Sequence, residues 1–109
     1  MTMTRDFKET VKERAGRDPA FAKALLDEAA TLFLNGEPHT ARLILRDLVN
    51  ASLGFETLAA ETRRPSKSLH RMLSEKGNPS MDNLAAIFGA VRKQLGVSIK
   101  AEAVSATVG

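Results

Sequence analysis

The segment FETLAAETRRPSKSLHRML, residues 55–73, constrains the fold of this 109-residue chain more than any other part of it. Apolar and small residues recur at helical spacing on both sides of Arg63, Arg64 and Pro65, which predicts short helices over residues 55–62 and 66–73. The small residues Ala59 and Ala60 would let the second helix cross the first closely. Apolar anchors toward a bundle are expected at Leu58, Leu69, Met72 and Leu73. This spacing is typical of a helix-turn-helix, which presents its second helix outward.

Start and stop signals predict the remaining helices. The first is expected over residues 1–16, with Phe7, Val11 and Ala15 on its apolar face and a stop at Gly16. The second (19–34) starts at Asp18-Pro19 and stops at Asn35-Gly36, and the third (38–52) starts at Glu37-Pro38 and stops at Gly54. The last (81–95) is capped by Ser80 and stops at Gly96. The helix over residues 38–52 is apolar on most sides, so we expect it at the centre of the bundle.

After Gly96 the pattern changes to period two. Residues 97–101, VSIKA, are a candidate strand, and residues 102–109 a frayed tail. Because one isolated strand is not stable, we expect it to pair with another chain, either a second copy or a different protein. The predicted fold is an all-α bundle with a short C-terminal extended segment. It divides into an N-terminal helical extension (1–36), a helix-turn-helix domain (37–101) and a tail (102–109).

Composition excludes several classes of protein. The chain has no Cys, which rules out disulfide frameworks, thiol catalysis and cysteine zinc sites, and it fits a reducing cytoplasm. No apolar run approaches the roughly 20 residues needed to cross a bilayer, so no membrane segment is expected. The first residues alternate in charge and lack the apolar core of a signal peptide.

No pattern of an enzyme or a cofactor site is present. Gly54, Gly77 and Gly89 stand alone, so no glycine-rich phosphate loop is formed. His39 and His70 have no partners at metal-ligand spacing, and the adjacent Asp27-Glu28 would point in different directions on a helix. We therefore expect a non-enzyme without metal or cofactor.

The positive charge is concentrated in one half of the chain. The formal net charge is +3, and residues 55–109 hold eight Lys and Arg against five Asp and Glu, so this half carries all of it. Five of these cations fall within residues 61–76: Arg63, Arg64, Lys67, Arg71 and Lys76. A basic patch beside a helix-turn-helix indicates binding of double-stranded DNA, although charge alone would equally fit an ordinary solvated surface.

The outward positions of the helix over residues 66–73 are the candidate DNA contacts. Four residues face outward and could together reach base edges: Ser66, Lys67, His70 and Arg71. Lys and Arg donate to guanine in the major groove. Ser68 and the first amides of this helix could hold a phosphate, and Arg63, Arg64 and Lys76 would contact the backbone from the flanks. Other interpretations remain open: Ser66 as a helix cap, His70 as a surface side chain and Arg71 as an ion-pair partner of Glu75.

A family resemblance supports this interpretation. Residues 37–96 resemble an Xre-type, lambda-repressor-like helix-turn-helix domain of five helices. The motifs LAAET, SLHRMLS, KGNPSMDNL and LGV are similar to those of HigA-type antitoxins, or addiction-module antidotes, and DPAFAKALLDEAATLFLNGEP resembles their lead-in helices. The resemblance covers roughly residues 18–100. It implies a cytoplasmic bacterial antitoxin that neutralises a RelE-like ribonuclease toxin and represses its own operon as a homodimer. By motif position it implies base contacts from Ser66, Lys67 and Arg71, and backbone contacts from Ser68 and Lys76.

The turn departs from the family pattern. Arg63-Arg64 replace the usual Gly and apolar residue, and a positive φ at Arg63 would cost about 1 kcal/mol. Three functions follow from the sequence: a repressor and antitoxin, a stand-alone Xre-type regulator without a toxin, and a helical adaptor that binds only protein. The role of residues 1–36 stays open between dimerisation, toxin binding and completion of the core.

Overall fold

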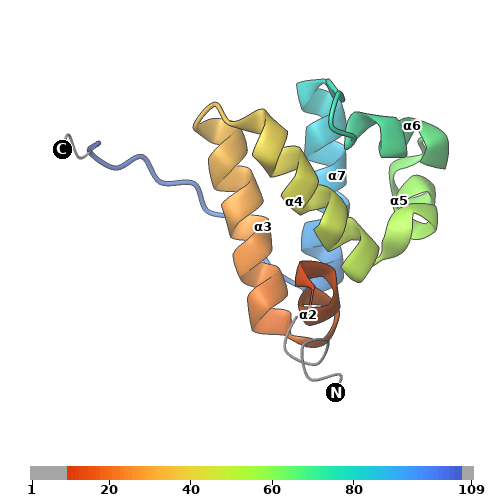
Figure 1. The fold of residues 1–109 in the computed structure, drawn as a ribbon, viewed down its shortest axis with the longest axis horizontal. Coiled ribbons are helices and arrows are strands. Elements are labelled where there is room, and N and C mark those ends of the chain that lie inside the picture. The colour runs from red at the N-terminus through yellow and green to blue at the C-terminus, as the bar shows by residue number, and fades with distance from the viewer. Residues whose placement is uncertain (1–9, 107–109) are drawn as a thin grey trace, which may run out of the picture.

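The computed structural model describes residues 10–106, and six α-helices form the body of this part of the chain (Figure 1). In chain order they are α2 (Val11–Arg17), α3 (Pro19–Leu34), α4 (Pro38–Ala51), α5 (Gly54–Thr62), α6 (Ser66–Met72) and α7 (Met81–Leu95). No strand occurs within residues 10–106. The described part of the chain is therefore all-α, as the sequence predicted.

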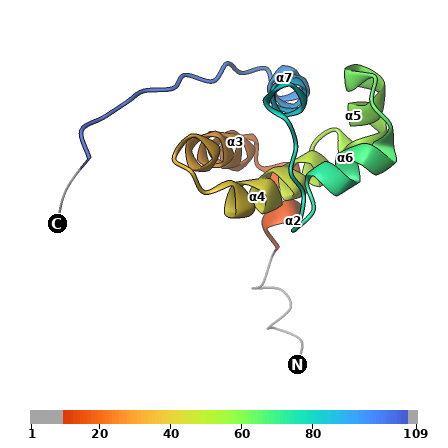
Figure 2. The same cartoon turned by 90° about the horizontal axis from the view of Figure 1, so that it is seen from above.

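Helix α4 lies between the two ends of the molecule. It packs against α2 and α3 on one side and against α5 on the other, while α7 contacts both α3 and α5. Viewed from above, α5 and α6 extend from one side of the body and the C-terminal segment from the opposite side (Figure 2). Helix α4 buries one face, formed by Ala41, Leu45, Leu48 and Val49, and its other residues are exposed or partly exposed. It is therefore amphipathic and not buried on most sides as the sequence predicted, although it does contact helices on both sides.

The predicted helix starts are confirmed where a side chain caps the helix. Asp18 accepts a hydrogen bond from the Phe21 N–H (3.2 Å) at the start of α3, and Ser80 accepts one from the Asn83 N–H (3.1 Å) at the start of α7. The hydrogen bond from Phe21 lowers the pKa of the Asp18 carboxyl, and Arg14 adds to this effect. Gly96 ends α7 in the left-handed region (φ 67°), as expected for a helix C-terminus.

Two predicted helix ends are wrong. Helix α2 continues through Gly16 to Arg17, because a capping box between Thr10 and Glu13 fixes its start and packing on α3 and α4 outweighs the roughly 1 kcal/mol that a glycine costs in a helix. Helix α4 ends at Ala51, and Gly54 (φ 79°) is the first residue of α5. The predicted first helix is also not continuous over residues 1–16, because Thr10 is extended (φ −73°, ψ 159°) and α2 starts at Val11. The part of this prediction that contains Phe7 lies outside the described residues.

The predicted strand over residues 97–101 is also not formed in the single chain. This segment is extended but pairs with no other strand among the described residues, and Val97 and Ile99 pack against the core. Residues 102–106 are exposed, and residues 107–109 lie outside the described part.

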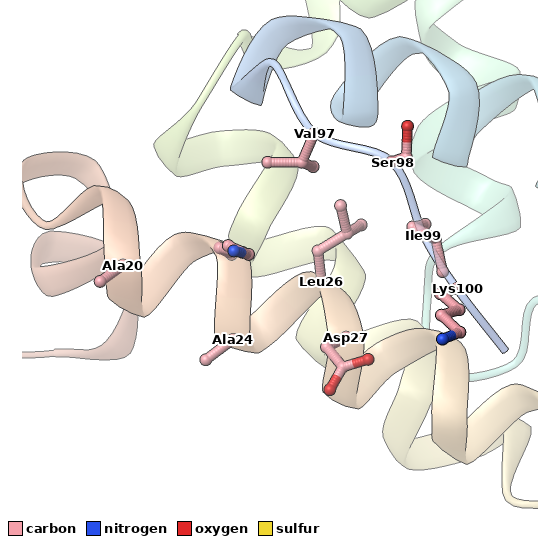
Figure 3. Close-up of a pocket in the computed structure, with 9 residues that line it drawn as sticks. Ala20, Ala24, Leu26, Asp27, Val97, Ser98, Ile99 and Lys100 are labelled. Carbon is pink, nitrogen blue, oxygen red and sulfur yellow. The ribbon is translucent and has the colours of Figure 1, made fainter. Parts of the chain in front are cut away.

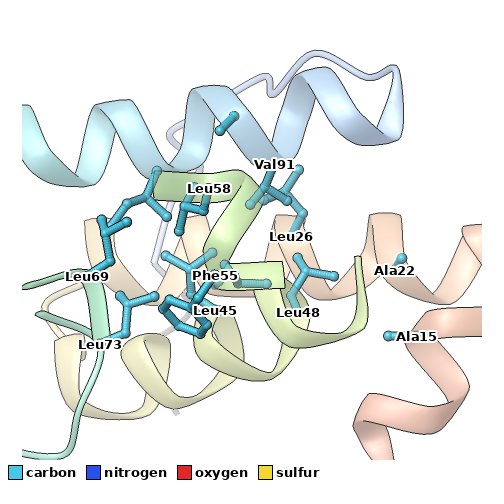
Figure 4. Packing of buried hydrophobic residues seen from close by; sticks show 14 residues of the cluster. Ala15, Ala22, Leu26, Leu45, Leu48, Phe55, Leu58, Leu69, Leu73 and Val91 are labelled. Carbon is cyan, nitrogen blue, oxygen red and sulfur yellow. The ribbon is translucent and has the colours of Figure 1, made fainter. Parts of the chain in front are cut away.

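One hydrophobic core runs through the body, and it crosses the expected boundary at residue 36. Ala22, Leu26 and Ala29 of α3 belong to the same cluster as Leu45, Leu48 and Val49 of α4 and the anchors of α5 and α6 (Figure 4). Of the three roles left open for residues 1–36, completion of the core is therefore seen directly for α2 and α3.

Candidate nucleic-acid interface

Helices α5 and α6 form a corner held by buried leucines. Leu58 of α5 and Leu69 and Leu73 from α6 and its C-terminal end are fully buried, and Figure 4 shows them gathered beside Phe55 and Leu45. Met72 is half-buried, so all four expected anchors point inward. A seven-residue helix is not stable alone, so these contacts fix the direction of α6.

The turn between α5 and α6 depends on a strained residue. Arg63 ends α5 with φ 56° and ψ 41°, which is the left-handed conformation. The positive φ whose cost was considered for this non-glycine residue is therefore present. The N–H groups of Arg63 and Arg64 both donate to the Ala59 carbonyl oxygen. The Arg63 side chain is exposed beside the start of α6. Helix α6 then begins after Pro65, which serves as its N-cap.

Arg64 has a structural role that the sequence did not indicate. Its Nε donates to Asn83 Oδ1 (2.6 Å) and its Nη1 donates to the Thr62 carbonyl oxygen (2.8 Å). The half-buried Arg64 side chain therefore ties the turn to α7. It was expected as a flanking phosphate contact, and in the free chain two of the five N–H groups of its guanidinium already have an acceptor.

The cations of α6 point to solvent without a partner. Lys67 and Arg71 are one helical turn apart and exposed, and within residues 10–106 neither side chain has an ion-pair or hydrogen-bond partner. The alternative ion pair between Arg71 and Glu75 is not formed. Lys76, just beyond α6, is also exposed. These three cations are thus available to an external anion.

The exposed acids of α5 and of the segment after α6 are Glu56, Glu61 and Glu75. Glu61 lies 3.9 Å from Lys93 Nζ on α7, so this acid has a cation of its own. Glu75 contributes its backbone carbonyl to Arg42 (Nη2, 3.0 Å), which brings one more positive charge behind the patch. The corner is therefore cationic on its outward side.

The small polar residues of α6 and His70 lie closer to the body. Ser66 and Ser68 are half-buried and cap no helix among the described residues. His70 is exposed at its edge, but its ring stacks on Phe55 with the centroids 3.8 Å apart and the planes at 18°. His70 therefore shields a core phenylalanine, which fits the surface side chain expected as an alternative. His39, also expected as a surface residue, is exposed at the start of α4.

Arg42 and Gly77 support the end of α6, and no sequence pattern indicated the role of Arg42. Arg42 of α4 donates from Nε to the Ser74 carbonyl oxygen (3.1 Å) and from Nη2 to the Glu75 carbonyl oxygen (3.0 Å). At Gly77 a Cβ atom would clash with the Met72 carbonyl oxygen and lie 2.7 Å from that of Arg71. The partners of Arg42 are more than 30 residues away in sequence, so no local pattern could identify it.

The comparisons with known proteins add no family. No protein-family model, curated protein or solved structure matches this chain. In the described range, no group of three or more His, Cys, Asp or Glu side chains is placed to hold a metal ion. No helix between residues 10 and 106 has both the length and the apolar character to cross a membrane.

Proposed function

We propose that this protein binds double-stranded DNA in a sequence-specific way through a helix-turn-helix formed by α5 and α6. Helix α6 is the reading helix, which enters the major groove. By occupying a promoter, the protein would repress transcription. No catalytic step is part of this function.

One observation carries the proposal. Lys67 and Arg71 stand exposed and unpartnered on the outer face of a helix whose inner face, Leu69 and Leu73, is completely buried. The buried leucines hold α6 in a fixed direction, and base contacts require side chains held in a defined direction.

Each cation is assigned a role by its position. Lys67, in the first turn, and Arg71, one turn further, would donate to guanine O6 and N7, with Ser66 as a less selective neighbour. Arg63 and Lys76 flank the reading helix and would contact phosphates. Arg64 would serve DNA binding mainly by holding the turn against α7.

We propose a homodimer as the DNA-binding form, since one short reading helix supplies few contacts. Two copies related by a two-fold axis would read half-sites about 34–36 Å apart or a multiple of that distance. If each subunit neutralises about three to five phosphates, the logarithm of the binding constant falls against that of the salt concentration with a slope of about −5 to −9.

The resemblance to HigA-type antitoxins extends the proposal to a toxin partner. In that form the protein neutralises a RelE-like toxin and represses the operon that encodes both. A neighbouring gene for a small basic RelE-like protein, and its co-purification with this chain, would distinguish the antitoxin from a stand-alone regulator.

A gel-shift assay with the DNA upstream of the protein's own gene tests DNA binding. The double variant Lys67→Ala, Arg71→Ala should lose the specific shift, while its unfolding free energy stays within about 0.5 kcal/mol of the wild type because both side chains are exposed. The control Lys12→Glu changes the net charge by the same two units at an exposed position of α2, which belongs neither to the reading helix nor to the helix-turn-helix. It should retain the shift.

The outcomes separate the alternatives. A shift that survives in the Lys67 and Arg71 variant means that α6 is not the reading helix. A wild type that shifts no DNA even at low salt leaves the protein-binding adaptor as the remaining function.

A further inference from the structure

The C-terminal segment leaves the body as an extended chain with an unpaired backbone. The Val97 N–H donates to the Arg92 carbonyl oxygen (3.1 Å), and Arg92 Nη1 donates to the Val97 carbonyl oxygen (3.2 Å). From Ser98 to Ala106 no backbone group has a hydrogen-bond partner among the described residues. This stretch therefore presents a free strand edge, which is a template for pairing with another strand.

A groove lies along the first part of this edge. The cavity, of about 510 Å³, is bounded by residues 97–100 on one side and by the N-terminal half of α3 on the other. Figure 3 shows the segment passing over α3, where the side chains of Ala20, Ala24 and Leu26 line the groove. Its α3 wall combines small and apolar side chains with two charged ones, Lys23 and Asp27, and the alanines leave room for the backbone of an added strand.

We propose that residues 97–105 pair with the same residues of a second copy, as two antiparallel strands related by a two-fold axis at Ala101. This inference rests on the homodimer of the proposed function, to which it assigns an interface. The second copy's strand would lie in the groove beside α3, and the groove of the second copy would receive this chain in the same way.

The charges of the segment select this register. A two-fold axis at Ala101 places Lys100 opposite Glu102 of the second copy, and Glu102 opposite the second copy's Lys100. An axis at Lys100 would oppose two lysines, and an axis at Glu102 would oppose two glutamates. Like charges directly across a strand pair are unfavourable, so the sequence is complementary to itself in the proposed register.

The alternation of side chains fits the same register. Val97 and Ile99 face the core, so the odd-numbered residues of the segment share the face toward α3. Residues directly opposite in an antiparallel pair lie on the same face, which brings Ala103 and Ser105 of the second copy over α3. These small side chains can approach the Ala20 and Ala24 surface closely.

A second copy explains these features better than an unrelated strand does. A two-stranded ribbon is marginal by itself, but here each strand is anchored to its own body by Val97 and Ile99 and rests on the other body's α3. An unrelated strand would have no reason to match the Lys100 and Glu102 pattern in reverse.

The test is a charge swap, with the dimer constant measured by sedimentation equilibrium at low salt and without DNA. Lys100→Glu and Glu102→Lys should each weaken the dimer about tenfold, because either change turns both symmetric pairs into repulsive ones. The double variant should return to within about twofold of the wild type. An equimolar mixture of the two single variants should form mainly the heterodimer, in which every pair is attractive again.

Other results overturn the inference. It is wrong if the wild type stays monomeric, if the single variants dimerise as well as the wild type, or if the double variant fails to recover. Both side chains are exposed, so the unfolding temperature of the monomer, measured at a protein concentration well below the dimer dissociation constant, should not change and serves as the folding control. The variant Lys67→Ala, Arg71→Ala should remain dimeric. If the charge-swap variants behave as expected but the wild type gives no gel shift, the DNA-binding proposal is refuted and the dimer interface stands.

Discussion

Replacing Arg63 by glycine should make the protein more stable and its DNA binding weaker. The left-handed conformation at Arg63 (φ 56°) costs a side-chain-bearing residue about 1–2 kcal/mol, whereas glycine adopts it freely. Glycine also adds about 0.5–1 kcal/mol of entropy to the unfolded chain, so the net gain is about 0.5–1 kcal/mol. For a chain of this length, the unfolding temperature should rise by about 2–6 °C.

The same change removes a proposed phosphate contact. Losing one contact in each subunit should make the salt dependence of DNA binding shallower by about 1.8 in slope for the dimer. Thermal unfolding followed by circular dichroism measures the first effect, and gel shifts over a salt series measure the second.

Arg63→Ala is the matched control. It removes the same charge but keeps a Cβ atom in the left-handed region, so it should weaken DNA binding equally without raising the unfolding temperature. The reasoning fails if the glycine variant is no more stable than the alanine variant, because the turn would then carry no strain.

Three further predictions concern the support of the reading helix and the cap of α3. Gly77→Ala should lower the unfolding free energy by about 1–3 kcal/mol, because its Cβ atom would collide with the Met72 carbonyl oxygen. The control is Gly89→Ala, whose Cβ atom would lie in open space within α7. In the same denaturant titration this control should raise the unfolding free energy by up to about 1 kcal/mol. Arg42→Lys should lower the unfolding free energy by about 1 kcal/mol, since lysine cannot donate to the Ser74 and Glu75 carbonyl oxygens at the same time. It should also weaken the gel shift, although residue 42 is not a proposed DNA contact. The pKa of Asp18 is lower in the folded chain than its ordinary value of 3.8, so the unfolded chain binds a proton at this carboxyl more readily. Asp18 therefore stabilises the fold at pH values above 3.8, and this stabilisation is lost as the pH falls below 3.8. Asp18→Asn should make the unfolding free energy depend less on pH in that range of an acid-unfolding curve.

Features decided by neighbouring residues were predictable from the sequence. The caps at Asp18 and Ser80 and the stop at Gly96 each depend on groups within a few residues, so their patterns are local. The inward positions of Leu58 and Leu69 follow from helical spacing and were predicted for the same reason.

Features decided by distant contacts were not predictable. Gly16 has a stop signal, yet packing of α2 against α3 and α4 carries the helix past it. Arg64 looks like one more exposed cation until the fold brings Asn83 to it from 19 residues away. His70 likewise gives no sequence sign that its ring will cover Phe55, because that contact exists only after α5 and α6 have packed.

The C-terminal segment leaves the body on the side opposite α6, as both views show (Figures 1 and 2). Two copies joined through their C-terminal segments would carry their reading helices at the outer ends of the assembly. The two half-sites of a cognate operator would therefore lie more than one turn of the duplex apart. Such an operator is sensitive to rotational phase. Inserting about five base pairs at its centre would turn one half-site to the far side of the DNA, and inserting about ten would bring it back into line.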